Sequence, residues 1–328
     1  MTVKPLSQII HNELLKSLSA AAEMSRVVRN RLDETTIWRK EDRSLVTAAD
    51  LAAQALILKT LIEHLPGEQV LAEESVETLD PPGRTEVVLE LVEQIDGHSI
   101  SKAELREWIG YRGEEDSDRI WLLDPIDGTK GYVRGSGYAL SLATLEEDRV
   151  TRSYLAVPES TLHVEGVTGF LFSAVRQEGA FKYDIVNGEV QSITPPPAPV
   201  AGRDALVIAA TRAHENVDLP PGAAAQGFEV GLLSMDSIAK YAALSTGAAH
   251  LYPRKPSRWI GPFYCWDHAA GVLLVEETDG KVTDLTGKSF DWSNKERLIH
   301  NKGIFAASQP DLYDRFQPLF IEHIRDIL

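Results

Sequence analysis

Apolar residues near the amino terminus recur at helical spacing and predict a long first helix over residues 6–32. Ser7 lies at the start of this pattern and can cap the helix. A second helical pattern begins near Thr47 and ends at Pro66-Gly67, where proline and glycine stop a helix. The charged segment 77–118 is also helical in pattern. The amino-terminal third of the chain is therefore expected to be mainly helical.

Short apolar runs farther along the chain predict strands. They are residues 69–75, 119–124, 138–150, 151–158 and 169–184. The proline-rich stretch TPPPAPV, residues 194–200, cannot join a helix or a central strand and is the best linker candidate. Strand-like and helix-like segments alternate beyond it, which is typical of an α/β unit. The predicted class is α/β, with an α+β domain over residues 1–195 and an α/β domain over residues 196–328.

Composition narrows the class of protein. A chain of 328 residues, 43% of them hydrophobic, is long enough for two packed units. Its formal net charge of −16 argues against binding a nucleic acid polymer or an anionic membrane. The single cysteine, Cys265, excludes an internal disulfide and favours a reducing, cytoplasmic location. The sequence shows neither the apolar core of a signal peptide nor a run long enough to span a bilayer.

Two aspartates stand at the end of a strand-like run in WLLDPIDGTKGYVRG, residues 121–135. A strand carries Asp124 and Asp127 to its carboxyl end, where ligands of α/β sheets bind. These carboxylates and the Ile126 carbonyl suit a hard cation such as Mg²⁺. Gly128 allows the backbone to approach an anion closely at the next turn. An ordinary turn rich in Asp, Pro and Gly is the alternative interpretation of the same residues.

Three other segments supply carboxylates, and each also has an ordinary structural interpretation. Glu73 and Glu74 follow another apolar run, as residues of an exposed loop also do. Asp267 precedes a predicted helix, where aspartate is a good N-cap. Asp50 lies three residues after Thr47, which is the spacing of a capping box. Spacing alone does not bring these segments together in space.

These motifs together resemble those of a known family. DPIDGTKGYVRG, with AEES upstream and WDHAAG downstream, is similar to the lithium-sensitive, magnesium-dependent phosphatase superfamily of inositol monophosphatases. Within that superfamily, Lys130-Gly131 and Arg134 resemble the 3′(2′),5′-bisphosphate nucleotidase branch. The resemblance extends from about residue 40 to about residue 308. It implies a layered αβαβα sandwich with the site between the two halves.

The resemblance also implies a set of metal ligands. Glu73, Asp124 and the Ile126 carbonyl would hold a first Mg²⁺. Asp124, Asp127 and Asp267 would hold a second, and a third ion would lie near Glu73 with mostly water ligands. Two or three Mg²⁺ ions are therefore the expected cofactor.

Catalytic and phosphate-binding roles come from the same resemblance. It assigns Asp50 and Thr129 to orienting and deprotonating the attacking water, with Glu74 close behind. The amides of Gly128 and Thr129 would bind phosphate oxygens, and Lys130 belongs to the expected substrate-binding set.

Four more residues match nucleotide contacts of the nucleotidase branch. Ser237 and Lys240 in MDSIAK, Arg254 in HLYPR, and His214 in ATRAHEN are the matches. Lys240 and Arg254 are suited to a 5′-phosphate. A solvated helix face is the alternative interpretation of Lys240, and a surface or structural position is the alternative for His214.

The expected function is hydrolysis of the 3′- or 2′-phosphate of an adenosine bisphosphate, with Li⁺ as an inhibitor. Leu45, Ala72 and Gly137 depart from the residues that relatives commonly carry, which leaves substrate identity open. The alternatives are a phosphatase for a specialised nucleoside phosphate, a sugar phosphate or an inositol phosphate, and a non-catalytic nucleotide or metal sensor. Oligomeric state is not indicated by the sequence.

Overall fold

A computed structural model describes residues 5–42, 44–159, 164–194, 197–211, 226–255 and 262–324. The helices are α1 (Gln8–Arg29), α2 (Ala48–His64), the 3₁₀ helix η1 (Val76–Leu79), α3 (Arg84–Asp96), α4 (Lys102–Gly110), α5 (Thr129–Arg134), α7 (Ala239–Thr246), α8 (Ala269–Glu276) and α9 (Pro310–Ile324). The strands are β1 (Ile37–Arg39), β2 (Leu45–Thr47), β3 (Gln69–Ala72), β4 (Ile120–Asp127), β5 (Ala139–Glu146), β6 (Arg149–Val157), β7 (Phe170–Val175), β8 (Gly179–Asp184), β9 (Val190–Ser192), β10 (Ala205–Ala210), β11 (Glu229–Ser234), β12 (Leu251–Arg254), β13 (Lys281–Thr283) and β14 (Ile304–Ala307).

The two amino-terminal helices begin where their capping residues predict. Ser7 Oγ accepts a hydrogen bond of 3.3 Å from the Ile10 amide at the start of α1. At the start of α2, Asp50 Oδ2 accepts hydrogen bonds from the Thr47 amide at 2.8 Å and from Thr47 Oγ1 at 2.5 Å. These bonds satisfy amide and hydroxyl donors that a helix start leaves unpaired. Both predicted helices are confirmed.

A seven-stranded sheet forms the centre of the amino-terminal half, in the order β3-β4-β5-β6-β7-β8-β9. Strands β3 and β4 are parallel, and the other neighbours are antiparallel. Alternate side chains of β4 enter two different cores: Trp121 and Leu123 pack with α1 and α2, and Leu122 packs with α7 and α8. Because successive side chains of a strand point to opposite faces, this uniformly apolar strand is buried between two helical layers.

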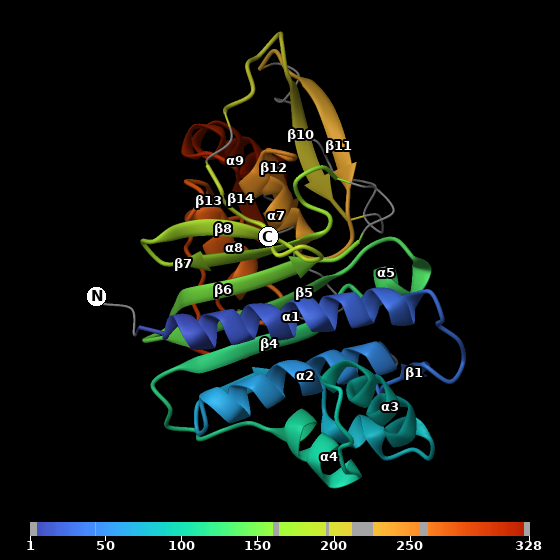
Figure 1. Cartoon of the computed structure of the whole chain (residues 1–328). Helices are drawn as coiled ribbons and strands as arrows, with labels where there is room; N and C mark the ends of the chain where they lie inside the picture. The colour runs from blue at the N-terminus through green and yellow to red at the C-terminus, as the bar shows by residue number, and fades with distance from the viewer. Residues whose placement is uncertain are drawn as a thin grey trace.

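The carboxyl-terminal half adds a second sheet, in the order β11-β10-β12-β14-β13. Helices α7 and α8 lie between the two sheets, and α9 covers the outer face of the second one. Figure 1 shows this succession, with blue α1 and α2 on the far side of the green strands from the orange elements. The layers are therefore helix, sheet, helix, sheet, helix, which confirms the αβαβα sandwich.

The two sheets are formed by separate stretches of the chain, as the predicted division into two domains would require. The seven-stranded sheet ends at Ser192 and the five-stranded sheet begins at Ala205, on either side of the proline-rich segment. The division at residues 195 and 196 itself stays a prediction. Among the described residues, no helix combines the length and apolar character that crossing a membrane requires.

Candidate active site

The end of β4 supplies two carboxylates from one short stretch, Asp124, which is buried, and Asp127, which is half-buried. The pairing of β4 with β5 shifts register between Asp124 and Asp127, so a bulge separates them. The Ile126 amide donates a 3.0 Å hydrogen bond to Asp124 Oδ1, which fixes that carboxylate within the bulge. A bulge redirects side chains that would otherwise alternate strictly. Both aspartates lie at the carboxyl end of β4, on either side of this irregularity.

Three carboxylates converge at this end of the sheet. Carboxylate oxygens of Glu73, Asp124 and Asp267 all lie within 4.8 Å of one another. The Glu73 amide donates a 3.0 Å hydrogen bond to the Leu123 carbonyl, which extends the parallel β3–β4 pairing by one residue. Asp267 lies in the turn before α8, where Ser141 Oγ donates a 3.0 Å hydrogen bond to the Trp266 carbonyl. The N-cap of α8 is His268, so the N-cap interpretation of Asp267 is wrong.

Burial and close packing of acidic groups raise the pKa values of the carboxylates at this site. Removal from water is the main cause for Asp124 and Asp267, and repulsion from neighbouring carboxylates adds to it. The pKa of Glu74 is also raised, mainly by burial. Glu74 Oε2 is inaccessible and has no hydrogen-bond partner among the described residues. A divalent cation would offset this concentration of charge, and the oxygen ligands suit a hard ion.

A second pair of residues links α2 to α5 beside the carboxylates. Thr129 Oγ1 lies 3.3 Å from Asp50 Oδ1 and 3.2 Å from the Ile126 carbonyl. Asp50 therefore closes the capping box with one oxygen and accepts from Thr129 with the other. Burial, with added repulsion from Glu73, raises the pKa of Asp50 to about 7. A carboxylate with this pKa is well matched to accept a proton near neutral pH.

A lysine that the spacing of motifs did not reveal lies over the paired glutamates. Lys40 Nζ is 2.6 Å from Glu74 Oε1 and 3.3 Å from Glu73 Oε1. Burial lowers the pKa of Lys40, but attraction to the two glutamates outweighs it and leaves the pKa above its usual range. Lys40 follows β1 directly, and only the folding of β1 against β2 brings it to the site. No local sequence signal identifies such a contact.

The turn at Gly128, which is the candidate phosphate-binding turn, packs against the turn at Ser237 in the carboxyl-terminal half of the chain. Gly128 has a φ of 86°, and a Cβ there would lie 3.1 Å from the Ser237 Cβ. The Ile238 amide donates a hydrogen bond to Asp127 Oδ2 across the same contact. Since the left-handed φ and the close approach both disfavour a larger residue, glycine is the residue best suited to this position.

Lys240 is buried beneath this turn and does not lie on a solvated helix face. Its ammonium donates a 3.0 Å hydrogen bond to the Met235 carbonyl and another bond to the Ser237 carbonyl. The ammonium also lies 5.3 Å from the centre of the Tyr252 ring. Burial, together with repulsion from Arg254, lowers the pKa of Lys240 to about 7. The solvated alternative for this residue is therefore wrong.

The remaining candidates differ in how far the structure places them. The Arg254 guanidinium is half-buried, 4.6 Å from the centre of the Phe263 ring. Lys130 is exposed on α5. His214 lies outside the described residues.

Comparison with known proteins identifies the family. The model of the inositol monophosphatase family matches residues 11–327, nearly the whole chain. This protein belongs to the inositol monophosphatase family. The 3′(2′),5′-bisphosphate nucleotidase of Schizosaccharomyces pombe is 31% identical over 92% of this chain and 87% of its own. The enzyme of the same name from Emericella nidulans is 33% identical over 82% and 85%.

Solved structures of the family share the fold. The Thermotoga maritima IMPase superposes with a TM-score of 0.64 at 20% identity, covering 96% of this chain and 97% of its own. CysQ from Bacteroides thetaiotaomicron superposes with a TM-score of 0.59 at 19% identity, covering 92% and 99%. The layered sandwich is therefore the fold of the inositol monophosphatase family.

The acidic site predicts how the stability of this family member depends on pH and Mg²⁺. The pKa values of Asp50, about 7, and Asp127, about 6, exceed the value of about 4 for aspartate in an unfolded chain. Without metal, the folded state therefore binds more protons than the unfolded chain between about pH 4 and pH 7, and stability falls as pH rises through this window.

Thermal unfolding in EDTA tests this expectation. The melting temperature should be lower at about pH 8 than at about pH 5, and excess Mg²⁺ should raise it by about 5 °C at pH 8. The Mg²⁺ effect should be smaller at pH 5, because protons already neutralise the carboxylates. Equal Mg²⁺ effects at both pH values would contradict the assignment of the raised pKa values to the metal-binding cluster.

Proposed function

We propose that this protein is a magnesium-dependent phosphomonoesterase that removes the 3′-phosphate, or the 2′-phosphate, of an adenosine 3′(2′),5′-bisphosphate. The observation that carries the proposal is the convergence of Glu73, Asp124 and Asp267 beside the Asp50–Thr129 pair. The substrate class is supported by relatives named 3′(2′),5′-bisphosphate nucleotidase that align with most of the chain.

The donor set fits Mg²⁺. Glu73, Asp124 and the Ile126 carbonyl would hold one ion, and Asp124, Asp127 and Asp267 would hold another. All of these groups would bind the metal through oxygen, which suits Mg²⁺. Carboxylate oxygens of Glu73, Asp124 and Asp267 already lie within 4.8 Å of one another. Bound Mg²⁺ supplies charge neutralisation for the phosphate and lowers the pKa of water at the site. A third ion near Glu73 is part of the proposal.

The chain's own residues would move the proton and hold the phosphate. Thr129 donates to Asp50, so its hydroxyl oxygen presents a lone pair toward an attacking water. Asp50 would accept the proton, since its raised pKa is close to neutral. The Gly128 and Thr129 amides would bind phosphate oxygens, and Glu74 would support the Asp50–Thr129 pair from close behind it.

Recognition of the nucleotide is proposed for the second half of the molecule. Ser237 and Arg254 would contact it, with Lys130 and His214 at the edge of the site. The ammonium of Lys240 reaches the carbonyls of the turn that contains Ser237, so this lysine would act from beneath the turn. Its positive charge opposes the rise in the pKa of Asp127, and repulsion from Arg254 adds to the burial that lowers the pKa of Lys240 itself.

A phosphatase that acts on a more specialised substrate is the second candidate function, and one observation favours it. Gly137 has a φ of 138°, and its carbonyl would lie 2.5 Å from a Cβ on Gly131 of α5. A glutamine, common at this position in the nucleotidase branch, does not readily adopt this backbone conformation. We infer that the loop that follows α5 has a different shape from the loop of relatives that carry glutamine here. A cytoplasmic location stays a prediction from the sequence.

Phosphate release from a panel of substrates tests the proposal. The panel contains the 3′- and 2′-phosphates of adenosine 5′-phosphate, adenosine 5′-monophosphate, inositol 1-phosphate and fructose 1,6-bisphosphate, each with Mg²⁺ and with or without Li⁺. We expect Li⁺-sensitive turnover of the adenosine bisphosphates at least about tenfold faster than of the other compounds, because only they combine an adenosine with a 5′-phosphate and a second phosphate on the ribose. Weak turnover of every compound would favour a specialised substrate, and complete absence of turnover would favour a sensor.

A further inference from the structure

Side chains make the hydrogen bonds to the Glu74 backbone, which lies just beyond the end of the β3–β4 pairing. Glu73 makes the last β3–β4 hydrogen bond, through its amide. One residue later, the Gln54 side chain takes the place of a neighbouring strand. Gln54 Nε2 donates to the Glu74 carbonyl at 2.8 Å, and the Glu74 amide donates to Gln54 Oε1 at 3.1 Å. This reciprocal pair fixes both polar groups of one residue, as a ladder bond pair does.

Arg112 also binds the carbonyl of Glu74. Its Nη2 lies 3.0 Å from the Glu74 carbonyl oxygen, and its Nη1 lies 3.1 Å from that of Ile109. Gln54 Nε2 also donates to the Ile109 carbonyl, at 2.9 Å. Two side chains therefore share two carbonyls, which ties the glutamate segment to α2 and to the end of α4.

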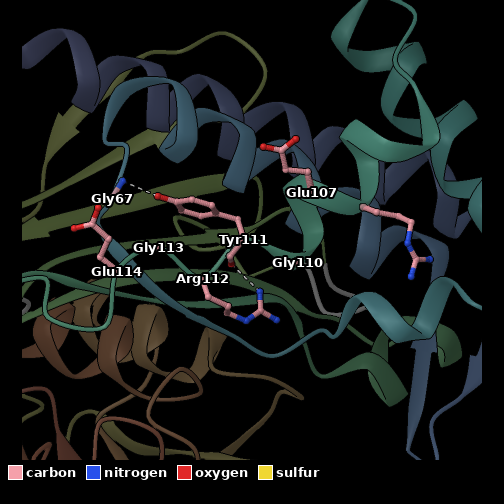
Figure 2. Close-up of a pocket in the computed structure, with 8 residues that line it drawn as sticks. Gly67, Glu107, Gly110, Tyr111, Arg112, Gly113 and Glu114 are labelled. Carbon is pink, nitrogen blue, oxygen red and sulfur yellow. Dashed lines mark hydrogen bonds between the residues drawn. The ribbon is translucent and has the colours of Figure 1, made fainter.

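Gln54 and Arg112 together form what we call the brace of Glu74, and the two side chains differ in solvent exposure. Gln54 is fully buried in α2, whereas Arg112 is half-buried. Arg112 lines a pocket of about 560 Å³ on the α4 side of the molecule. Figure 2 shows the Arg112 side chain beside Tyr111, whose hydroxyl accepts a 2.8 Å hydrogen bond from the Gly67 amide. Arg112 can therefore be replaced without opening the apolar core.

We propose that Gln54 and Arg112 are positioning residues that hold the Glu73–Glu74 backbone so that both carboxylates face the metal site. The proposal rests on the proposed magnesium-dependent function. Glu73 contributes an oxygen to the three-carboxylate cluster, and Glu74 carries the buried unpartnered oxygen. Because cation affinity depends on ligand spacing, loss of the brace weakens metal binding more than it slows the chemical step.

Calorimetric titration of Mg²⁺ into the substrate-free protein tests the proposal. Arg112→Met is expected to raise the Mg²⁺ dissociation constant about tenfold, the lower end of the effect of losing a residue that supports metal ligands. At saturating Mg²⁺, kcat should stay within about threefold of wild type. Arg112→Lys should recover part of the affinity, since one ammonium can still donate to the Glu74 carbonyl. Gln54→Glu, which keeps the acceptor and loses both donor bonds, should weaken binding in the same direction.

Arg84→Met is the matched control. The Arg84 guanidinium also donates to a backbone carbonyl, that of Thr78, at 3.0 Å, but makes no hydrogen bond to Glu74. The Mg²⁺ affinity of the Arg84→Met variant should equal that of wild type. Unchanged Mg²⁺ affinity in Arg112→Met, even with a lowered melting temperature, would overturn the positioning role and leave the proposed function standing. A wild-type protein that binds no Mg²⁺ would overturn both.

Discussion

Asp50→Asn is expected to lower kcat by about 10³-fold or more while the protein still folds and binds Mg²⁺. The asparagine oxygen can accept from the Thr47 amide and hydroxyl as Asp50 Oδ2 does, so the capping box persists. The asparagine nitrogen would then face Thr129 Oγ1 and donate to it. The substitution removes the proton acceptor with almost no change in shape. Alanine would also remove the cap at a cost of about 1 kcal/mol of stability, so the loss of activity could not be separated from the loss of stability.

Single-turnover phosphate release, with Mg²⁺ titration of the same variant, checks this expectation. Thr129→Val should lose activity to a similar extent, and Thr129→Ser should retain most of it because the hydroxyl is kept. If Asp50 and Thr129 act as one unit, the double variant should be no slower than either single variant by more than about threefold. An Asp50→Asn enzyme within tenfold of the wild-type rate would rule out the assigned water activation.

Asp124→Asn is expected to change metal-free stability and metal affinity in opposite directions. Asp124 is almost fully buried, and repulsion from Glu73, Asp127 and Asp267 adds to the burial that raises its pKa. Asparagine can still accept from the Ile126 amide, as Asp124 Oδ1 does at 3.0 Å. In EDTA at about pH 8 the variant should therefore melt a few degrees higher than wild type, since one repelling charge is gone.

The same variant should lose most of its stabilisation by Mg²⁺ and about 10³-fold or more of its turnover, because Asp124 is proposed to contribute to both ions. Thermal unfolding with EDTA and with Mg²⁺ measures both effects. Asp148→Asn, an exposed aspartate in the β5–β6 turn, is the control and should leave both unchanged. A variant that is destabilised in EDTA yet fully stabilised by Mg²⁺ would be inconsistent with Asp124 as a shared ligand.

Local features of the sequence were sufficient to predict many of the helices and strands and the candidate chemistry. Helix starts at Ser7 and Thr47 follow from capping side chains that bond within three residues. The apolar run of β4 predicts a buried strand that ends in carboxylates, because side-chain alternation is a property of the backbone itself. The motifs at Glu73, Asp124 and Asp267 also carried the resemblance to the inositol monophosphatase family, which the family match then confirmed.

Other features depend on which segments become neighbours. Glu73 lies beside Asp124 because β3 pairs in parallel with β4, and the spacing of the two motifs does not specify that pairing. Lys40 reaches the glutamates, and Arg112 reaches the Glu74 carbonyl, over 33 to 38 residues of chain. Lys240 was open to two interpretations, and packing beneath the turn at Ser237 decided against the solvated one.

The sequence by itself therefore determined many of the helices and strands, the acidic motifs and the family to which they belong. Tertiary structure alone decided which carboxylates share a site, which cation lies over them and which side chains brace their backbone. The physical reason is range: caps, turns and side-chain alternation act within a few residues, whereas pKa values and contacts at the site arise among groups that only the packed sheets and helices bring together.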